Sequence, residues 1–310
     1  MNRKSFLSSA ALTAGWMAVN PLGLSAQVLR DRGWRKITVL HTNDTHSQID
    51  PFPSNDPKYP GEGGFARRAA LVDMIRKEEP NVLLLDAGDI FQGTPYFNFY
   101  GGELEFKLMS RLKYDAATLG NHDFDNGIEG LVKQLPHASF PFVNANYDVS
   151  NTLLKDKIQP YIIKEMEGIR VGIFGIGVEL AGLVDPKLYG EIQYQNPISR
   201  ANTVAAQLKH DYKCHLIICL SHLGYEYATK KVSDRILAEE SKNIHLIIGG
   251  HTHTFLDQPE EKLNADGRKV WINQVGWGGL YLGRIDFIFG DSEKVFSTSN
   301  SLYKIFKKTI

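Results

Sequence analysis

Apolar and polar positions follow two alternating patterns along most of the chain. Short apolar runs, typical of buried strands, are separated by segments in which apolar positions recur every three or four residues, the spacing of an amphipathic helix. The predicted strands are 36–40, 81–85, 115–119, 161–163, 169–176, 214–220, 245–248, 269–275 and 280–289. The predicted helices are 64–79, 104–112, 203–212 and 232–240.

This alternation of strands and helices predicts a layered α/β fold. The sequence contains no internal repeat, no low-complexity tract and no convincing interdomain linker, so residues 27–310 are predicted to form one domain. The longest loop candidate is 43–64, which is rich in Pro, Gly, Asn and Asp. Long ordered loops of this kind often border functional sites.

The first 26 residues have the three-part pattern of a secretory leader. A basic start at Arg3 and Lys4 precedes an apolar stretch at 10–19, and small residues follow Pro21. The apolar stretch is too short to span a bilayer, which takes about 20 residues. The start resembles a twin-arginine export signal with Lys4 in place of the second arginine, so either export route stays open. We predict a periplasmic or extracellular protein with no membrane span after leader removal.

Composition argues against a polymeric partner. The 35 basic residues balance the 35 acidic residues, and no basic stripe is visible. A protein that binds nucleic acid normally shows a basic excess or a basic face. The sequence therefore gives no reason to expect a nucleic-acid polymer as a ligand.

Potential metal ligands gather where five of the predicted strands end. The carboxyl ends of strands in an α/β sheet border one crevice, so the loops that follow them can converge. Residues two apart lie on the same side of an extended backbone, which applies to Asp44 with His46 and to His251 with His253. The seven ligand-type residues are Asp44, His46, Asp89, Asn121, His222, His251 and His253.

These residue types suit a pair of divalent cations. Imidazole and carboxylate ligands favour zinc, manganese or iron. Seven ligands form two four-coordinate sites if one carboxylate bridges, and Asp89 is the best candidate for the bridge. A bridged metal pair can hold a hydroxide at neutral pH and clamp the oxygens of an in-line displacement at phosphorus. Any one cluster alone is more often structural, and their joint occurrence is what favours the metal site.

Other polar and aromatic residues near these clusters have simpler interpretations. His215 and His245 occupy strand positions that need no function. Four aromatic residues follow the Asp89 motif, and core packing is favoured for them over a wall facing the substrate. These four are Tyr96, Phe97, Phe99 and Tyr100.

Five stretches, at 40–46, 86–94, 118–127, 221–224 and 249–253, resemble motifs of the calcineurin-like metallophosphoesterase superfamily. Within it, the chain is most similar to the catalytic domain of the 5′-nucleotidase family, and the resemblance covers roughly residues 36–290. It implies a two-sheet β-sandwich flanked by helices. It also implies that one metal ion is bound by Asp44, His46, Asp89 and His253. The second would be bound by Asp89, Asn121, His222 and His251.

The same resemblance implies a catalytic dyad. His122 would donate a proton to the phosphate or to its leaving group, and Asp125 would orient the imidazole. Purple acid phosphatases, a sister group, carry a tyrosine at the position of Gln92. The glutamine therefore argues against a tyrosinate–iron centre, and zinc or manganese remains the favoured metal of the pair.

One departure from the family concerns substrate recognition. Family members usually carry a second, C-terminal domain that holds the base, and this chain ends too soon after His253 to contain one. We therefore expect either broad tolerance among phosphate esters or a separate substrate-binding chain. Such a chain would dock at 43–64 or at the aromatic residues 96–100.

Three functions remain open at this point. The favoured one is an exported dinuclear-metal phosphomonoesterase, similar to 5′-nucleotidase, that hydrolyses nucleotides by attack of a metal-bridged hydroxide. The second is a phosphodiesterase, sugar-nucleotide hydrolase or thioester-type hydrolase that uses the same metal pair. The third is a non-enzymatic subunit that needs a separate substrate-binding chain. The dyad of His122 and Asp125 argues against a purely structural site.

Overall fold

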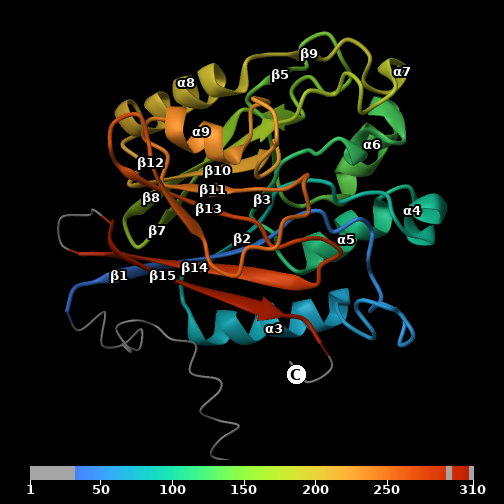
Figure 1. Cartoon of the computed structure of the whole chain (residues 1–310), viewed down its shortest axis with the longest axis horizontal. Helices are drawn as coiled ribbons and strands as arrows, with labels where there is room; N and C mark the ends of the chain where they lie inside the picture. Colours follow the sequence, from blue (N-terminus) through green and yellow to red (C-terminus); the bar gives the residue numbers. More distant parts are fainter. Residues whose placement is uncertain (1–31, 291–294, 307–310) are drawn as a thin grey trace, which may run out of the picture.

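The computed structural model describes residues 32–290 and 295–306. The predicted leader at 1–26 lies outside these residues. Helices and strands carry the labels of Figure 1. Within the described part of the chain, no helix has the length and apolar character needed to span a bilayer.

Most of the chain lies in two sheets and the helices that flank them. The strands are β1 (Arg35–Thr42), β2 (Val82–Asp86), β3 (Ala116–Ala117), β4 (Phe142–Val143), β5 (Tyr147–Asp148), β6 (Ile158–Gln159), β7 (Tyr161–Met166), β8 (Ile169–Gly177), β9 (Gln193–Tyr194), β10 (Leu216–His222), β11 (Leu246–Ile248), β12 (Glu260–Leu263), β13 (Lys269–Asn273), β14 (Tyr281–Phe289) and β15 (Val295–Lys304). The α-helices are α3 (Phe65–Glu78), α4 (Pro95–Tyr100), α5 (Glu103–Arg111), α6 (Gly127–Gln134), α7 (Pro186–Tyr189), α8 (Pro197–His210) and α9 (Asp234–Glu240). Two short 3-10 helices are η1 (His122–Phe124) and η2 (Leu135–His137).

The predicted β-sandwich is confirmed. One sheet has the order β15-β14-β1-β2-β3-β4-β6 and the other has the order β12-β13-β11-β10-β8-β7. Figure 1 shows the two sheets stacked between α3 on one outer side and α8 with α9 on the other. The small pair β5-β9 stands apart from both sheets.

Alternating apolar residues along the strands build separate cores on the two faces of each sheet. In β10, Leu216, Ile218 and Leu220 join the core between the sheets. Ile217 and Cys219, on the opposite face, join the core under α8 and α9. Because both faces of the strand are covered, it is apolar throughout, as expected for a buried parallel strand.

Helix starts depend on capping residues that the apolar pattern does not reveal. α8 begins at Pro197, earlier than the predicted start at 203, because the Asn196 side chain accepts a hydrogen bond from Ser199 N–H. Proline is favoured at the first helical position, where its missing N–H costs nothing. Strands β12 and β15 were not predicted.

Parallel pairing sets the position of the site. β1, β2 and β3 run parallel in the first sheet, and β8, β10, β11 and β13 run parallel in the second. The predicted ligands therefore lie at the carboxyl ends of β1, β2, β3, β10 and β11 and in the loops that follow these strands. They meet along one shared edge of the sandwich.

Candidate metal centre

Ligand-type side chains from both sheets meet in two groups. In each group, one ligand atom from each side chain lies within 4.8 Å of the others. The first group contains Asp44 and His46, which follow β1, and His253, which follows β11. The second group consists of Asp89, His222 and His251. Each group takes residues from both sheets, so the centre exists only when the sandwich is assembled.

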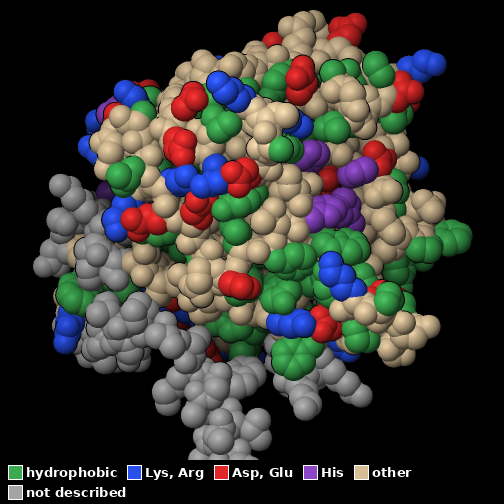
Figure 2. All heavy atoms as spheres, viewed as in Figure 1, with side chains coloured by type: hydrophobic (Ala, Val, Ile, Leu, Met, Phe, Trp, Pro, Cys, Tyr) green, Lys and Arg blue, Asp and Glu red, His purple; other side chains and the backbone are tan. Residues whose placement is uncertain are grey.

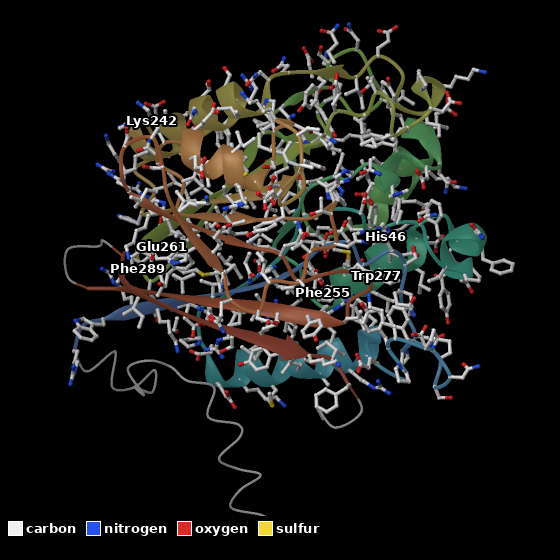
Figure 3. All side chains as sticks on the ribbon, in the orientation of Figure 1. His46, Lys242, Phe255, Glu261, Trp277 and Phe289 are labelled. Atoms are coloured by element: carbon white, nitrogen blue, oxygen red, sulfur yellow. The ribbon has the colours of Figure 1, made fainter. Side chains whose placement is uncertain are left out.

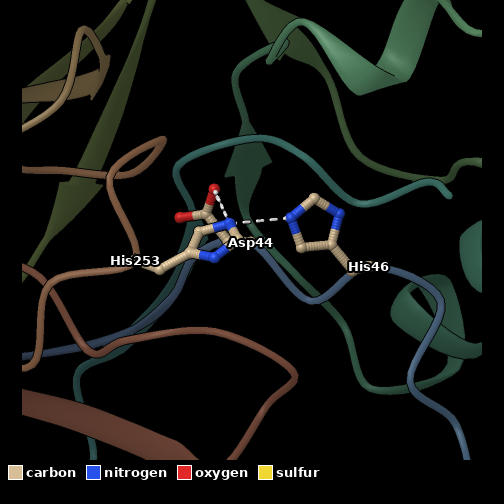
Figure 4. A group of neighbouring side chains, drawn as sticks. All are labelled: Asp44, His46 and His253. Carbon is tan, nitrogen blue, oxygen red and sulfur yellow. Dashed lines mark hydrogen bonds and ion pairs between the residues drawn. The ribbon is translucent and has the colours of Figure 1, made fainter. Parts of the chain in front are cut away.

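The first group brings two imidazoles together with a carboxylate. His46 Nε2 and His253 Nε2 are 2.9 Å apart, and His253 Nε2 is 3.5 Å from Asp44 Oδ1. Figure 4 shows both rings and the carboxylate pointing toward one small space. In Figure 2 histidine side chains gather at one place on the surface, so the centre is open to solvent on one side.

Asp89 lies between the two groups. Its Oδ2 is 3.1 Å from His222 Nε2 and 3.9 Å from His46 Nε2. Its Oδ1 accepts a hydrogen bond of 2.8 Å from His122 N–H. One oxygen is thus held by the backbone and the other faces nitrogens of both groups, which is the arrangement required of a bridging carboxylate.

Asn121, the seventh predicted ligand, follows β3 and is buried. Among the described residues, its side-chain oxygen has no hydrogen-bond partner. A buried polar atom without a partner costs free energy comparable to a lost hydrogen bond. This oxygen therefore fits a role as a metal ligand.

Backbone contacts fix the tautomers of two histidines. His46 Nδ1 lies 3.2 Å from the Phe91 carbonyl oxygen, and His222 Nδ1 lies 2.7 Å from the Ala87 carbonyl oxygen. Because a carbonyl oxygen only accepts, each Nδ1 carries the proton and donates. Each Nε2 therefore faces the centre, where a metal ion that displaces any proton there can bind its lone pair.

Five of the seven predicted ligands have left-handed backbone. Their φ angles are 48° at Asp44, 47° at His46, 55° at Asp89, 72° at His251 and 52° at His253. The interpretation that residues two apart converge through extended backbone is therefore wrong. Sharp left-handed turns bring them together, at a cost of about 1–2 kcal/mol per residue.

Neighbouring loops hold these turns in place. Asp44 N–H donates to Gly88 O at 2.9 Å, and His46 N–H donates to Asp89 O at 3.1 Å. A Cβ at Gly120 would lie 2.2 Å from Asp89 Oδ1, so only glycine fits there. Contacts between loops that follow adjacent strands thus hold the left-handed turns in place despite their energetic cost.

The electrostatics of the centre favour a positive charge. Burial lowers the pKa of His222, but the carboxylates of Asp89 and Asp44 outweigh it and raise the pKa to about 10. Burial alone raises the pKa of Asp89, yet His222 lowers it overall. Burial lowers the pKa of His251 to about 3 and that of His253 to about 4. These residues therefore suit cations, with the carboxylate ionised and the two part-exposed imidazoles neutral.

The predicted dyad lies at the mouth of the centre. His122 Nδ1 is 2.9 Å from Asp125 Oδ2, and both side chains are part-exposed. The hydrogen bond to Asp125 raises the pKa of His122. The His122 ring meets the His46 ring at 5.4 Å in an edge-on contact, which places it beside the first group.

Asp123 is a functional residue that the sequence analysis missed. Its buried carboxylate accepts four backbone N–H bonds, from Asp89, Ile90, Phe91 and Gly120, at 2.7–3.2 Å. These bonds fix the turn that carries the predicted bridging ligand. The only signal in the sequence is a carboxylate between His122 and Asp125, which gives no hint that it turns inward.

Two buried amides tie the loops after β1 and β11 to the loop after β13. Asn43 donates to Asp44 Oδ2 and to Gly276 O, both at 2.6 Å. Gln274 donates to Gly250 O at 2.6 Å and accepts from Thr254 N–H. No sequence pattern marks either amide, because most of its partners lie far away along the chain.

The core-packing interpretation of the aromatic residues after Asp89 is wrong for two of the four. Phe97 is buried, but Phe99 is 82% exposed and Tyr100 is 51% exposed. They lie on α4, in which Phe97 is the buried residue.

Two groups of imidazole and carboxylate ligands at the joined edges of two sheets, beside a histidine–aspartate dyad, define a metallophosphoesterase type of site. The model of the calcineurin-like phosphoesterase family matches residues 37–255, and the chain belongs to this family.

Several characterised proteins are similar to this chain. Snake venom 5′-nucleotidase from Crotalus adamanteus is 35% identical, over 86% of this chain and 47% of its own length. The 5′-nucleotidase precursor of Thermus thermophilus has a TM-score of 0.80 at 32% identity, covering 89% of this chain and 55% of its own. The calcineurin-like phosphoesterase YfkN of Bacillus subtilis has a TM-score of 0.72 at 27% identity, covering 87% of this chain and 91% of the solved chain. The chain spans about half the length of the curated relatives it matches.

Proposed function

We propose that this chain is a dinuclear-metal phosphomonoesterase that hydrolyses nucleotides, similar to 5′-nucleotidases. The observation that carries the proposal is the pair of three-residue ligand groups, each drawing residues from both sheets, beside the His122–Asp125 dyad. Similarity to 5′-nucleotidases over 86% of the chain supports the nucleotide as substrate.

The ligands divide between two divalent cations. We assign Asp44, His46, Asp89 and His253 to one ion. We assign Asp89, Asn121, His222 and His251 to the other. Imidazole and carboxylate donors favour zinc or manganese, and iron is compatible. Such a metal pair, when bound, supplies Lewis-acid polarisation of the phosphoryl group and activates water for attack.

The dyad supplies the proton. With Nδ1 held by Asp125, Nε2 is the nitrogen of the His122 ring that can donate to a substrate. The hydrogen bond to Asp125 favours the protonated ring. His122 therefore binds the phosphate as a donor and delivers a proton to the leaving oxygen, while Asp125 holds the orientation.

Location and domain boundaries are part of the same proposal. Residues 1–26 are proposed as an export leader and 27–310 as the catalytic domain, and the similarity to a venom protein is in keeping with a secreted enzyme. A separate chain that completes the substrate site stays a prediction.

A substrate panel on the purified, metal-loaded chain tests the function. We expect hydrolysis of 5′-nucleotides, together with other phosphate monoesters, to exceed that of cyclic nucleotides, sugar nucleotides and thioesters, and to disappear with chelator. Elemental analysis is expected to find about two divalent ions per chain. Preference for a cyclic or sugar nucleotide would favour the second function named above, and a chain without stoichiometric metal under any loading would refute the proposal.

A further inference from the structure

We propose that five aromatic side chains beside the metal centre bind the flat ring of the substrate's leaving group. This aromatic shelf consists of Phe52, Tyr59, Phe255, Trp277 and Tyr281. The inference rests on the proposed function and specifies how that site recognises its substrate: the shelf takes a planar ring attached to the phosphate ester, such as a nucleobase.

The shelf begins at a predicted metal ligand. The ring of Trp277 stacks on the ring of His253 with 5.8 Å between centroids and 13° between planes. His253 Nε2 in turn points into the first ligand group. Figure 3 shows Trp277 close to His46, with Phe255 farther along the same side. Only the His253 ring therefore separates Trp277 from a phosphate bound at the centre.

The remaining rings continue from Trp277 without a break. Phe52 lies 5.4 Å and Tyr59 lies 6.3 Å from the Trp277 ring, both in edge-on contacts. Tyr59 is 6.4 Å from Phe255, which is 5.5 Å from Tyr281. Edge-on and offset contacts at these distances are the favoured geometries of aromatic pairs.

Glycines on both sides of Trp277 make this packing possible. A Cβ at Gly276 would lie 2.0 Å from the Phe255 ring, and a Cβ at Gly278 would lie 2.9 Å from the Phe52 ring. Both glycines also have left-handed backbone, with φ of 74° and 62°. The loop is thus built so that two rings flank the tryptophan closely.

The shelf is not part of the hydrophobic interior. Among the described residues, the three buried cores contain none of its five rings. Phe52 is buried, but Phe255 is 37% exposed and the other three rings are partly exposed. Figure 2 shows hydrophobic side chains directly beside the histidines on this face. When a further ring covers aromatic surface that is exposed to water, the free energy falls, so ring binding next to the reactive centre is favoured.

The chemistry of the shelf selects a ring rather than a charged group. Its side chains are uncharged, and the phosphate is already taken by the metal centre. Stacking of a base on aromatic side chains tolerates any base, because every base has a π-face. We therefore expect a preference for esters that carry a ring, with little discrimination between bases.

The test compares two phosphate esters that share the ribose and the phosphate, of which only one carries a base. For the zinc-loaded chain, Trp277→Ala is expected to raise KM for adenosine 5′-monophosphate about tenfold or more. The same variant is expected to raise KM for ribose 5-phosphate much less, so the ratio of the two KM values is the readout that isolates the base. Trp277→Phe, which keeps a ring, is expected to restore most of the affinity. Tyr212→Ala removes a ring that is 39% exposed and lies just before β10, at the opposite end of the strands, and serves as the control.

Other outcomes separate this inference from the proposed function. An equal rise in KM for both substrates, or no rise for either, with metal content unchanged, would show that the shelf does not read the ring. If the loaded wild-type chain hydrolyses neither substrate, the proposed function fails, and calorimetry with adenosine tests the shelf alone. Adenosine binding weakened by Trp277→Ala then supports the shelf, whereas undetectable or unchanged binding overturns it.

Discussion

Two ends of the same strands carry histidines in opposite chemical states. At the carboxyl end of β10, His222 Nδ1 lies against the Ala87 carbonyl oxygen and donates to it. At the amino end of β11, His245 Nδ1 accepts a hydrogen bond of 3.1 Å from Ile217 N–H. His215, at the amino end of β10, likewise accepts from Arg170 N–H at 2.9 Å.

This difference decides what each ring can bind. A neutral imidazole has one lone pair and one N–H. Where Nδ1 donates, as in His222, the lone pair is on Nε2 and is available to a cation. Where Nδ1 accepts, as in His245 and His215, the backbone already uses the lone pair. The backbone partner of Nδ1 thus distinguishes His222, a candidate ligand, from His245 and His215, whose rings serve the backbone.

The largest expected effect comes from replacing one histidine at each end of the strands with glutamine. His222→Gln is expected to lose metal and to reduce turnover to the background of chelator-treated protein, since it removes a buried ligand. His245→Gln is expected to keep both metal and turnover, because its ring serves only the backbone. Elemental analysis and steady-state kinetics on the two variants decide this. Loss of metal in His245→Gln, or full metal content in His222→Gln, would break the comparison.

The next effect concerns a histidine that is not assigned as a ligand. His122→Ala is expected to reduce kcat by roughly 10²–10⁴-fold, the usual contribution of a general acid or base. Metal content is expected to stay at the wild-type value, because the ring pairs with Asp125 rather than with the ligand groups. A variant that loses metal instead would place His122 among the ligands.

A smaller effect is expected from the carboxylate behind Asp89. Asp123→Asn replaces one acceptor oxygen with an amide group that faces backbone N–H donors. Metal affinity is expected to fall about 10–100-fold, as for other residues that orient a ligand. Asp125→Asn is the matched comparison and is expected to lower turnover with unchanged metal affinity. Equal metal affinity in Asp123→Asn and wild type would count against the positioning role.

The last effect is on the free energy of unfolding and appears only in acid. Burial lowers the pKa of His245 from 6.5 to about 4 in the folded chain. Between these values the unfolded chain takes up a proton that the folded chain does not. Stability is therefore present above about pH 6.5 and is lost as the pH falls toward 4, by about 3 kcal/mol.

Denaturant unfolding of the metal-free chain between pH 7 and pH 4 measures this loss. His245→Gln is expected to lose less stability than wild type over that range, because it has no ring to protonate. Parallel stability curves for the two proteins would mean that the His245 ring is not held neutral by the fold.

The layered α/β fold and the meeting of five strand ends could be predicted because both follow from periodic apolar runs. The continuous apolar run of β10, which includes Leu216 and Ile218, is such a local signal. The left-handed turns at Asp44 and Asp89 could not be predicted, since they depend on hydrogen bonds between loops that are distant in sequence. Trp277 was missed for the same reason: its partner His253 is recognisable only in space.

The pairing of β1 with β14 has a consequence for how the chain folds. Arg35 pairs with Phe289, and the pairing continues to His41 with Gly283. Before β14 has been synthesised, one edge of β1 has no partner, so the first sheet cannot be completed until residues 281–289 have left the ribosome. Pairing of segments so distant in sequence makes folding slow and exposes strand edges to aggregation in the interval. A chain truncated before β14 would therefore be expected to aggregate, even though every predicted metal ligand precedes that point.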